Sequence, residues 1–203
     1  MSFAPIRMAF LIVLAMASFA LAEGAGTILL APTKDQDGNI RYLVLIADHK
    51  DSDRGYATMG GGIEEGEDPR DAAARETEQE SRGKYRREAI RQKIEHARAI
   101  KKGNFTVYVV VVEDLIPEEE LEAASMDCED CGERYGYKWI PLPELDEVVK
   151  TNGYTLPKDQ RSKHSETDHL WGEFVNAYIV AKSEIAKEVK KDRSRRSKSP
   201  MIE

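Results

Sequence analysis

The sequence predicts a fold of the α/β class, because runs with the composition of β-strands are interspersed with runs that have the periodicity of helices. Two apolar runs, residues 25–32 and 41–48, flank a polar separator that contains Asp37-Gly38, a dipeptide typical of hairpin turns. Residues 104–115 (NFTVYVVVVEDL) are apolar on both faces, which is typical of a central strand. The length of 203 residues suits one domain.

The segment from Pro69 to Ser81 is predicted to be a helix. Asp68 suits the N-cap, Pro69 suits the first helical position, and Asp71 lies near the positive end of the helix dipole. Gly83 supplies a stop. The sequence therefore marks both ends of this helix.

A second helix is predicted to begin at Ser165, where Ser165 and Asp168 resemble a capping box. It carries an apolar stripe, which core packing explains most simply. The stripe consists of Leu170, Trp171, Phe174, Val175, Tyr178 and Ile179. Between the two helices, residues 137–142 (YKWIPL) predict a short strand, and the periodicity of residues 81–102 leaves strand and short helix open.

Residues 1–22 have the pattern of a cleaved secretory signal peptide. Arg7 precedes an apolar run, and the segment closes on the small-x-small ending Ala20-Leu21-Ala22. The run is too short and too weakly flanked to favour a membrane anchor, which is the alternative interpretation. We therefore expect cleavage after Ala22 and a secreted or periplasmic product.

The mature chain is expected to be acidic, with an uneven distribution of charge. The whole chain has a formal net charge of -7. One domain over residues 23–190 and a disordered basic tail over residues 191–203 are predicted. Residues 81–102 contain nine Lys or Arg against two Glu, a pattern typical of a solvated face; a landing surface for polyanions is the alternative. We expect neither DNA binding nor membrane contact after cleavage, and the sequence does not indicate an oligomeric state.

The only two cysteines of the sequence, Cys128 and Cys131, form the motif CEDC. After export they are expected to pair as a tight local disulfide. Zinc binding together with His164 and His169 is an alternative, disfavoured because the separation is long. A thioredoxin-like redox role is also disfavoured, because the supporting strand–CxxC–helix context is lacking.

Residues 60–83 concentrate carboxylates where like charges repel. Glu76 and Glu80 lie four residues apart, so on a helix they share a face, where their repulsion costs about 0.3 kcal/mol. A solvated acidic helix is one interpretation. The other is a site for a divalent cation, because a hard cation prefers oxygen ligands and neutralises both charges. Gln79 offers a further oxygen on that side, and Glu67 lies where the turning chain brings it close.

Three consecutive glycines precede these acids: Gly60, Gly61 and Gly62. Because glycine has no Cβ, the backbone can approach a ligand closely there. We expect these glycines to contact the substrate, together with Arg54 from the preceding polar loop. Arg75 is expected to hold Glu67 by a charge-assisted hydrogen bond.

The spacing of these residues resembles the Nudix box, whose pattern is Gly-x5-Glu-x7-Arg-Glu-U-x-Glu-Glu-x-Gly-U, with U a bulky aliphatic residue. Gly61, Glu67 and Arg75-Glu76 match it in type and spacing. The other segments fall in the family's usual order, so the resemblance covers nearly all of the mature chain. It implies a MutT-like Nudix hydrolase, secreted and with a slightly degenerate box. It also implies a Nudix fold, in which a mixed β-sheet is sandwiched between helices.

Members of this family hydrolyse a diphosphate linked to another group, with Mg²⁺ or Mn²⁺ held by helix glutamates. The resemblance implies that Glu76 and Glu80 are metal ligands and catalytic residues. Gln79 and Glu67 are implied as further metal-site residues, together with the backbone carbonyl of Gly61. Arg75 is implied as a catalytic residue in an orienting role.

Many relatives place one more acid in the loop before a late tryptophan-containing strand. Glu133, six residues before Trp139, is the candidate for this acid and for a catalytic proton acceptor. Glu113 and Glu119 are weaker candidates.

Three residues depart from the family's pattern. Gln79 replaces the first Glu of a Glu-Glu pair, which removes a negative charge and is expected to weaken metal binding and water activation. Thr77 replaces an aliphatic residue. Arg82 occupies the usual glycine position, with Gly83 one residue late, which predicts a slightly longer helix.

The resulting hypothesis is Mg²⁺-dependent hydrolysis of a diphosphate linkage in a small polyphosphate, either a nucleoside-diphosphate-X compound or an inositol pyrophosphate. One alternative is a Nudix-fold module that binds phosphorylated ligands without turnover, as a consequence of Gln79. Another is an exported interaction protein with a merely solvated acidic helix.

Overall fold

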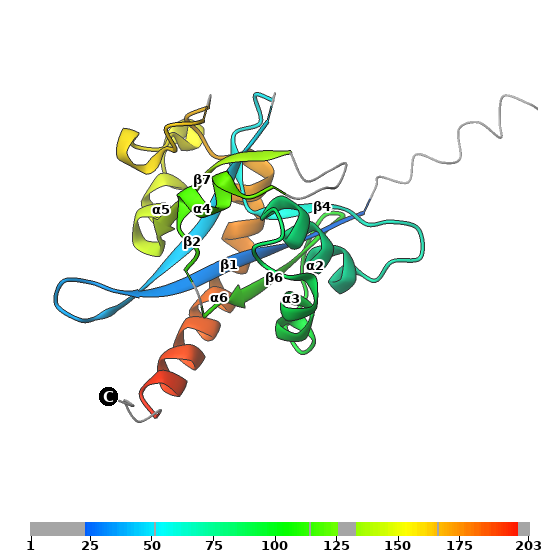
Figure 1. Cartoon of the computed structure of the whole chain (residues 1–203), viewed down its shortest axis with the longest axis horizontal. Coiled ribbons are helices and arrows are strands. Elements are labelled where there is room, and N and C mark those ends of the chain that lie inside the picture. Colours follow the sequence, from blue (N-terminus) through cyan, green and yellow to red (C-terminus); the bar gives the residue numbers. More distant parts are fainter. Residues whose placement is uncertain (1–22, 51, 114, 126–132, 166, 199–203) are drawn as a thin grey trace, which may run out of the picture.

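The sheet is built around its first strand, β1 (Gly24–Lys34), in a computed structural model that describes residues 23–198 except 51, 114, 126–132 and 166 (Figure 1). The first part of β1 pairs antiparallel with β4 (Met59–Gly62), and its last part pairs antiparallel with β2 (Ile40–His49). β6 (Phe105–Val111) runs parallel to β1 on the other side. β1 therefore has partners along both edges, which fixes the position of β4.

Three further pairings complete the seven-stranded mixed sheet. β3 (Tyr56–Ala57) and β7 (Arg134–Pro141) pair antiparallel with β2, and β5 (Ile100–Lys102) pairs antiparallel with β6. The predicted hairpin is confirmed, because β1 and β2 are joined by a tight turn in which Gly38 has a positive φ of 79°.

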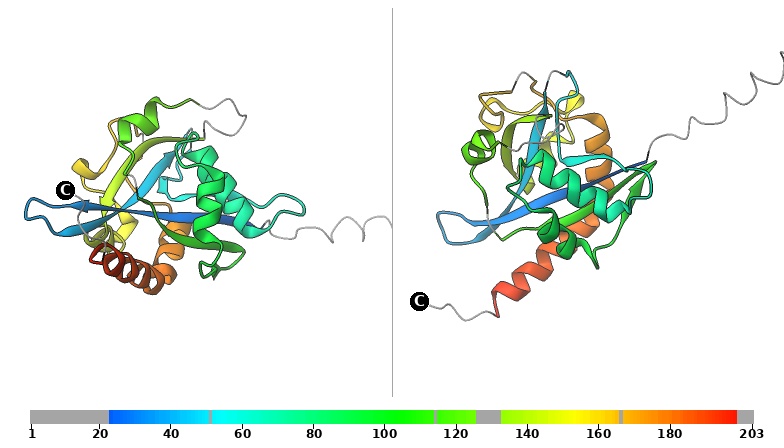
Figure 2. Two further views of the ribbon diagram at one scale, coloured as in Figure 1. Left: turned by 60° about the horizontal axis from the view of Figure 1, so that its bottom comes forward. Right: turned by 45° about the vertical axis from the view of Figure 1, so that its right-hand side comes forward.

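Helices cover both faces of the sheet (Figures 1 and 2). One face packs against α2 (Pro69–Glu80), α3 (Arg87–Ile94) and α4 (Glu118–Ala123), whereas the other packs against α5 (Leu142–Val148) and α6 (Gly172–Arg196). The pleat of β6 explains its apolar composition, because alternate residues enter the two cores. The predicted fold, a mixed sheet between helices, is therefore confirmed.

The segment between α5 and α6 holds two short 3₁₀ helices, Asn152–Tyr154 and Lys158–Gln160. Here the sequence prediction was wrong, because α6 begins at Gly172 and not at Ser165. The hydroxyls of Ser165 and Thr167 instead donate to the carboxylate of Asp48, which is fully buried near the end of β2. The polar residues that resemble a helix cap thus anchor a loop to the sheet.

The far part of α6 also differs from the prediction. The helix continues to Arg196, so the tail predicted to be disordered from residue 191 is helical over its first six residues. Asp192 explains this order, because its carboxylate accepts hydrogen bonds from Tyr42 Oη at 2.9 Å and Arg196 Nε at 2.6 Å. Ile179 of the predicted stripe is 49% exposed and does not belong to the core.

The basic stretch over residues 81–102 folds as α3 followed by β5. Most of its cations lie within 4 Å of a carboxylate: Arg91 contacts Asp71, and Arg87 contacts Glu67. These pairings favour the interpretation as a solvated, locally neutralised face over a landing surface for polyanions.

Two sequence predictions fall outside the described residues: the signal peptide over residues 1–22 and the pairing of Cys128 with Cys131. Among the helices that the structure describes, none is both long and apolar enough to cross a membrane.

Candidate active site

The three glycines lie in β4. One side of this strand faces α2, and the other side faces the α6 side of the sheet. The pleat turns successive residues to opposite sides. A Cβ on Gly61 would lie 2.6 Å from both carboxylate oxygens of Glu76, whereas a Cβ on Gly60 would lie 2.8 Å from the ring of Phe105. Glycine is therefore required at 61 for the close approach of an α2 carboxylate to the strand.

Helix α2 reaches this position because its inner face is small. Ala72, Ala73 and Ala74 are fully buried against the sheet. Thr77 is buried too, where it donates to the carbonyl of Ala73 and lies 2.7 Å from the hydroxyl of Thr27. The hydroxyl of Thr27 on β1 thus explains the threonine at position 77. An aliphatic side chain there would leave this buried hydroxyl without its partner.

Both ends of α2 are fixed, and the second end corrects a prediction. Asp68 caps the first turn by accepting from the backbone N–H of Arg70 at 2.8 Å, as predicted. The helix ends at Glu80 and is not longer than the family pattern, because Arg82 itself adopts a left-handed conformation with φ of 53°. Such a conformation costs a non-glycine residue roughly 1–2 kcal/mol.

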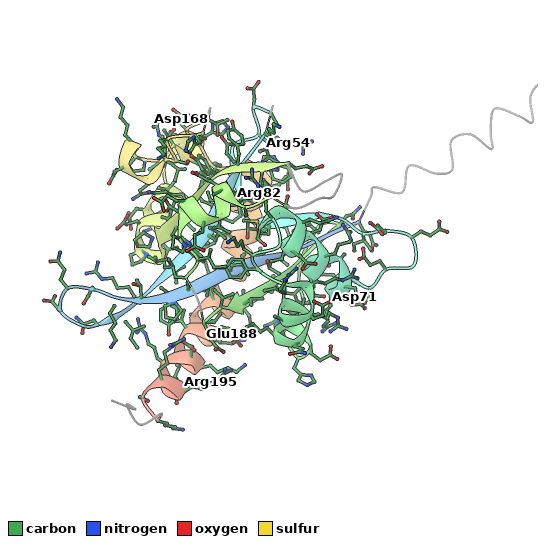
Figure 3. All side chains as sticks on the ribbon, in the orientation of Figure 1. Arg54, Asp71, Arg82, Asp168, Glu188 and Arg195 are labelled. Carbon is green, nitrogen blue, oxygen red and sulfur yellow. The ribbon has the colours of Figure 1, made fainter. Side chains whose placement is uncertain are left out.

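Arg82 offsets this cost with its side chain at the carboxyl end of α2 (Figure 3). The guanidinium donates to the carbonyl oxygens of Glu122 at 2.6 Å and Arg134 at 2.8 Å, and it lies over the ring of Tyr137. A glycine at this position would make none of these contacts. Arg82 thereby ties the end of α2 to the start of β7.

Arg75 gathers the acids on the outer side of the site. Its guanidinium donates to both carboxylate oxygens of Glu67, at 3.1 and 3.0 Å, which is the contact predicted from the sequence. It also donates to Glu76 at 2.7 Å, to the amide oxygen of Gln79 at 3.0 Å and to the carbonyl of Gly62 at 2.8 Å. One cation therefore orders the loop, two residues of α2 and the end of β4.

Glu80 lies deeper and has a second arginine. One of its carboxylate oxygens accepts from Arg134 Nε at 2.6 Å, and the other accepts from the backbone N–H of Gly60 at 2.6 Å. Both side chains are buried, with 4% of Glu80 and 2% of Arg134 exposed. Arg134 also contacts His49 Nδ1 at 2.8 Å and the carbonyl of Thr58 at 3.2 Å.

The three glutamates have different electrostatic environments. The hydrogen bonds from Arg75 hold the pKa of Glu67 below its usual range. Burial raises the pKa of Glu76 against the opposing charge of Arg75, and the nearby charge of Glu133 adds to this increase. Burial raises the pKa of Glu80 to about 7, although Arg134 and the Gly60 N–H favour the ionised form. Of the three, only Glu67 therefore has a pKa below its usual range.

The predicted site residues divide into those brought together and those kept apart. Glu133 lies close enough to Glu76 to influence its pKa. Glu113 pairs with Lys93 of α3 and follows the far end of β6, away from the glycines. Glu119 borders a different, open depression beside α4.

Arg54 lies away from α2 (Figure 3), with its guanidinium 5.7 Å from the ring centroid of Trp171. Trp171 in turn lines a cavity of about 130 Å³ on the α6 side of β4. The lining includes Phe105, Trp171, Phe174, Lys102, Gly60 and Arg134. Gly60 and Arg134 both contact Glu80, so this aromatic cavity adjoins the acids of α2 across the strand.

Sequence reasoning missed the buried set formed by Arg134, His49 and Thr58. The signal that could have found it is Arg134 itself, which begins the strand that contains Trp139. A charged residue in a buried strand needs a partner there, because charged residues are almost never fully buried unless paired.

The donor set suits a hard divalent cation in type: the carboxylates of Glu76 and Glu80, the amide oxygen of Gln79 and the carbonyl of Gly61. Within the described part of the chain, no three His, Cys, Asp or Glu side chains cluster closely enough to hold a metal. Arg75 and Arg134 instead neutralise these acids. Mg²⁺ or Mn²⁺ therefore fits the chemistry of the residues, on condition that these ion pairs give way to it.

We predict that His49 makes stability depend on pH. Burial and then the charge of Arg134 lower the pKa of His49 from 6.5 to about 4. Between these values the unfolded chain binds a proton that the folded chain does not, so the free energy of unfolding falls as the pH falls from 6.5 to 4, by up to about 3 kcal/mol. Urea unfolding of the protein and of His49→Gln at several pH values measures this.

The variant is the control, because the carboxylates titrate in both proteins. The stability of the wild type relative to His49→Gln should decrease as the pH is lowered through this window. A difference that stays constant from pH 7 to pH 4.5 would show that His49 is not kept neutral by its surroundings.

One family model matches the chain, and several solved structures are similar to it. A model of the NUDIX domain family matches residues 22–159. A search of curated proteins gives no match. Similar solved structures include a mutT/nudix family protein from Listeria innocua, at 15% identity and a TM-score of 0.46, covering 83% of this chain and 96% of that one.

Two further similar structures have comparable scores. An Ap4A hydrolase binary complex from C. elegans has 13% identity and a TM-score of 0.42, covering 81% of this chain and 99% of that one. The Nudix hydrolase RenU from M. smegmatis has 15% identity and a TM-score of 0.43, covering 82% and 87%. The family match spans more than half of the sequence and includes β4 and α2, and the chain therefore belongs to the NUDIX domain family.

Proposed function

We propose that this chain hydrolyses a diphosphate linkage in a nucleoside-diphosphate-X type of substrate, with Mg²⁺ or Mn²⁺. The observation that carries the proposal is the placement of Glu76 and Glu80 of α2 against the glycine strand β4, whose other side borders an aromatic cavity. Such a substrate has two parts, an anionic diphosphate and a planar base, and the two sides of β4 offer chemistry for each.

The residues of the chain have distinct roles in this reaction. Glu76, Glu80 and the carbonyl of Gly61 would hold the cation, which when bound neutralises diphosphate charge and lowers the pKa of an attacking water. Arg75 fixes Glu67 and Gln79 beside them. Glu133 is the candidate proton acceptor, since it lies near Glu76 outside the arginine contacts that occupy the α2 acids.

The cavity favours a nucleoside over an inositol polyphosphate. Phe105, Trp171 and Phe174 supply apolar and aromatic surface, on which a base can stack. An inositol pyrophosphate carries many phosphates and would require a cluster of free cations. Lys102 is a cation of the lining, but Arg134 is already paired with Glu80, and most cations of the basic stretch 81–102 are paired with acids.

A binding module without turnover is the second candidate. It is favoured by the charge of the site, in which Gln79 lacks the carboxylate of the family pattern and Arg134 neutralises Glu80. Both features weaken the binding of a divalent cation.

We predict that the chain from Glu23 onward, incubated with Mg²⁺ or Mn²⁺, hydrolyses nucleotide substrates from a panel that also contains an inositol pyrophosphate. The nucleotides are a dinucleoside polyphosphate, ADP-ribose, NADH and nucleoside triphosphates, and product release is measured by phosphate assay and chromatography. Glu76→Gln should lower the rate by about 100-fold or more, because it removes a charged ligand. Gln79→Glu should raise it.

The panel also separates the alternatives. Hydrolysis of the inositol pyrophosphate alone would contradict the nucleoside assignment. Binding of nucleotides without product release, with release restored in Gln79→Glu, would identify the chain as a module that has lost turnover. If the chain binds none of these compounds and its melting temperature does not change with millimolar Mg²⁺ or Mn²⁺, the result favours an interaction protein with a solvated acidic helix.

Gly61→Ala is predicted to lower activity without unfolding the protein. The new Cβ would displace the carboxylate of Glu76, which lies at the end of a flexible side chain and can move. A displacement of this size is expected to cost roughly 10- to 100-fold in rate. Thermal unfolding and steady-state hydrolysis of the best panel substrate measure the two effects.

Gly62→Ala is the matched control, because a Cβ there would meet no atom within 4 Å. It should leave Glu76 in place and the melting temperature close to the wild type, and it should lower the rate less than Gly61→Ala does. Equal losses in the two variants would mean that the effect comes from the glycine strand in general and not from Glu76.

Export stays part of the proposal. Residues 1–22 have the composition of a signal peptide, and the family match begins at residue 22. We propose that the chain acts after their removal, on extracellular or periplasmic nucleotides, or in another cell.

A further inference from the structure

Both carboxylate oxygens of Glu80 accept a hydrogen bond from another described residue. Arg134 Nε donates to one oxygen at 2.6 Å and the Gly60 N–H donates to the other at 2.6 Å. Both charged side chains are at most 4% exposed. A cation that binds Glu80 must therefore share the carboxylate with these two donors, of which Arg134 carries a positive charge and Gly60 is fixed in the sheet by its pairing with β1.

Arg134 is held firmly in this place. Its side chain also contacts His49 Nδ1 at 2.8 Å and the carbonyl of Thr58 at 3.2 Å, and its own carbonyl accepts from Arg82 at 2.8 Å. It is thus a built part of the site and differs from Arg87, whose side chain is 42% exposed and reaches Glu67 at 3.8 Å.

The guanidinium and a divalent cation compete for the same carboxylate charge. A fixed positive charge in contact with Glu80 also repels a cation bound nearby, and burial strengthens this repulsion because water does not screen it. The Gln79 amide supplies no negative charge to offset it.

We propose that Arg134 competes with the divalent cation for Glu80 and thereby lowers the metal affinity of the site. The inference rests on the proposed metal-dependent function. Arg134 also lines the aromatic cavity, so a guanidinium that leaves Glu80 remains beside the proposed substrate.

The test compares Mn²⁺ binding by the wild-type chain and by Arg134→Gln, by calorimetry and by the rise in melting temperature that Mn²⁺ causes. Removal of the competing charge should tighten Mn²⁺ binding by about tenfold or more. The variant should also be less stable without metal and gain more from it, because Glu80 is then buried without a counter-charge. Glu80→Gln in the Arg134→Gln background should abolish the gain.

Arg91→Gln is the matched control. Arg91 pairs with Asp71 at 2.8 Å in the first turn of α2, near the end of the helix opposite to Arg82 (Figure 3). This variant removes the same charge without touching Glu80, so its Mn²⁺ affinity should equal that of the wild type. An equal gain in both variants would reduce the effect to net charge and overturn the proposal.

A measurement on the unaltered protein covers the case in which Arg134→Gln does not fold. The Nε–H resonance of Arg134, assigned by its absence in Arg134→Lys, should shift as Mg²⁺ saturates the site. An unchanged resonance throughout the titration would overturn the proposal.

The outcomes distinguish this inference from the proposed function. If the wild type and Arg134→Gln bind Mn²⁺ equally well, the competition is absent while metal-dependent chemistry stands. If both folded proteins fail to bind Mn²⁺, the inference and the proposed function fail together.

Discussion

The site depends on keeping two glutamate carboxylates close to a strand backbone, where burial disfavours their charge. Glu76 and Glu80 meet this constraint in different ways. Glu76 rests against Gly61 and pairs with Arg75 near the surface, whereas Glu80 is enclosed between Gly60 and Arg134. Without these partners the carboxylates would repel each other and turn to solvent.

Much of the surrounding structure serves this arrangement. The alanines of α2 let the helix lie close to β1, and the hydrogen bond between Thr27 and Thr77 fixes how it is rotated. Arg82 joins the end of the helix to β7, the strand that supplies Arg134. Three segments distant in the sequence, β4, α2 and the start of β7, therefore meet around Glu80, and the aromatic cavity opens on the other side of the same strand.

The sequence predicted the parts that local patterns determine. The cap at Asp68, the hairpin and the apolar alternation of β6 depend on neighbours in the chain. The contact of Arg75 with Glu67 also joins residues only eight apart. The start of α6 was mispredicted because Ser165 serves a buried carboxylate on a distant strand. Arg134 was missed for a similar reason, since its partner lies 54 residues away and only its place at the start of a strand marks it in the sequence.

The most direct test of the account is the crystal structure of the chain soaked in Mn²⁺, with anomalous diffraction to locate the metal. The account predicts a peak between α2 and β4, bound by Glu76, Glu80 and the carbonyl of Gly61, with the Arg134 guanidinium withdrawn from Glu80. An empty pocket, or Glu76 and Glu80 turned away from β4 toward solvent, would contradict it.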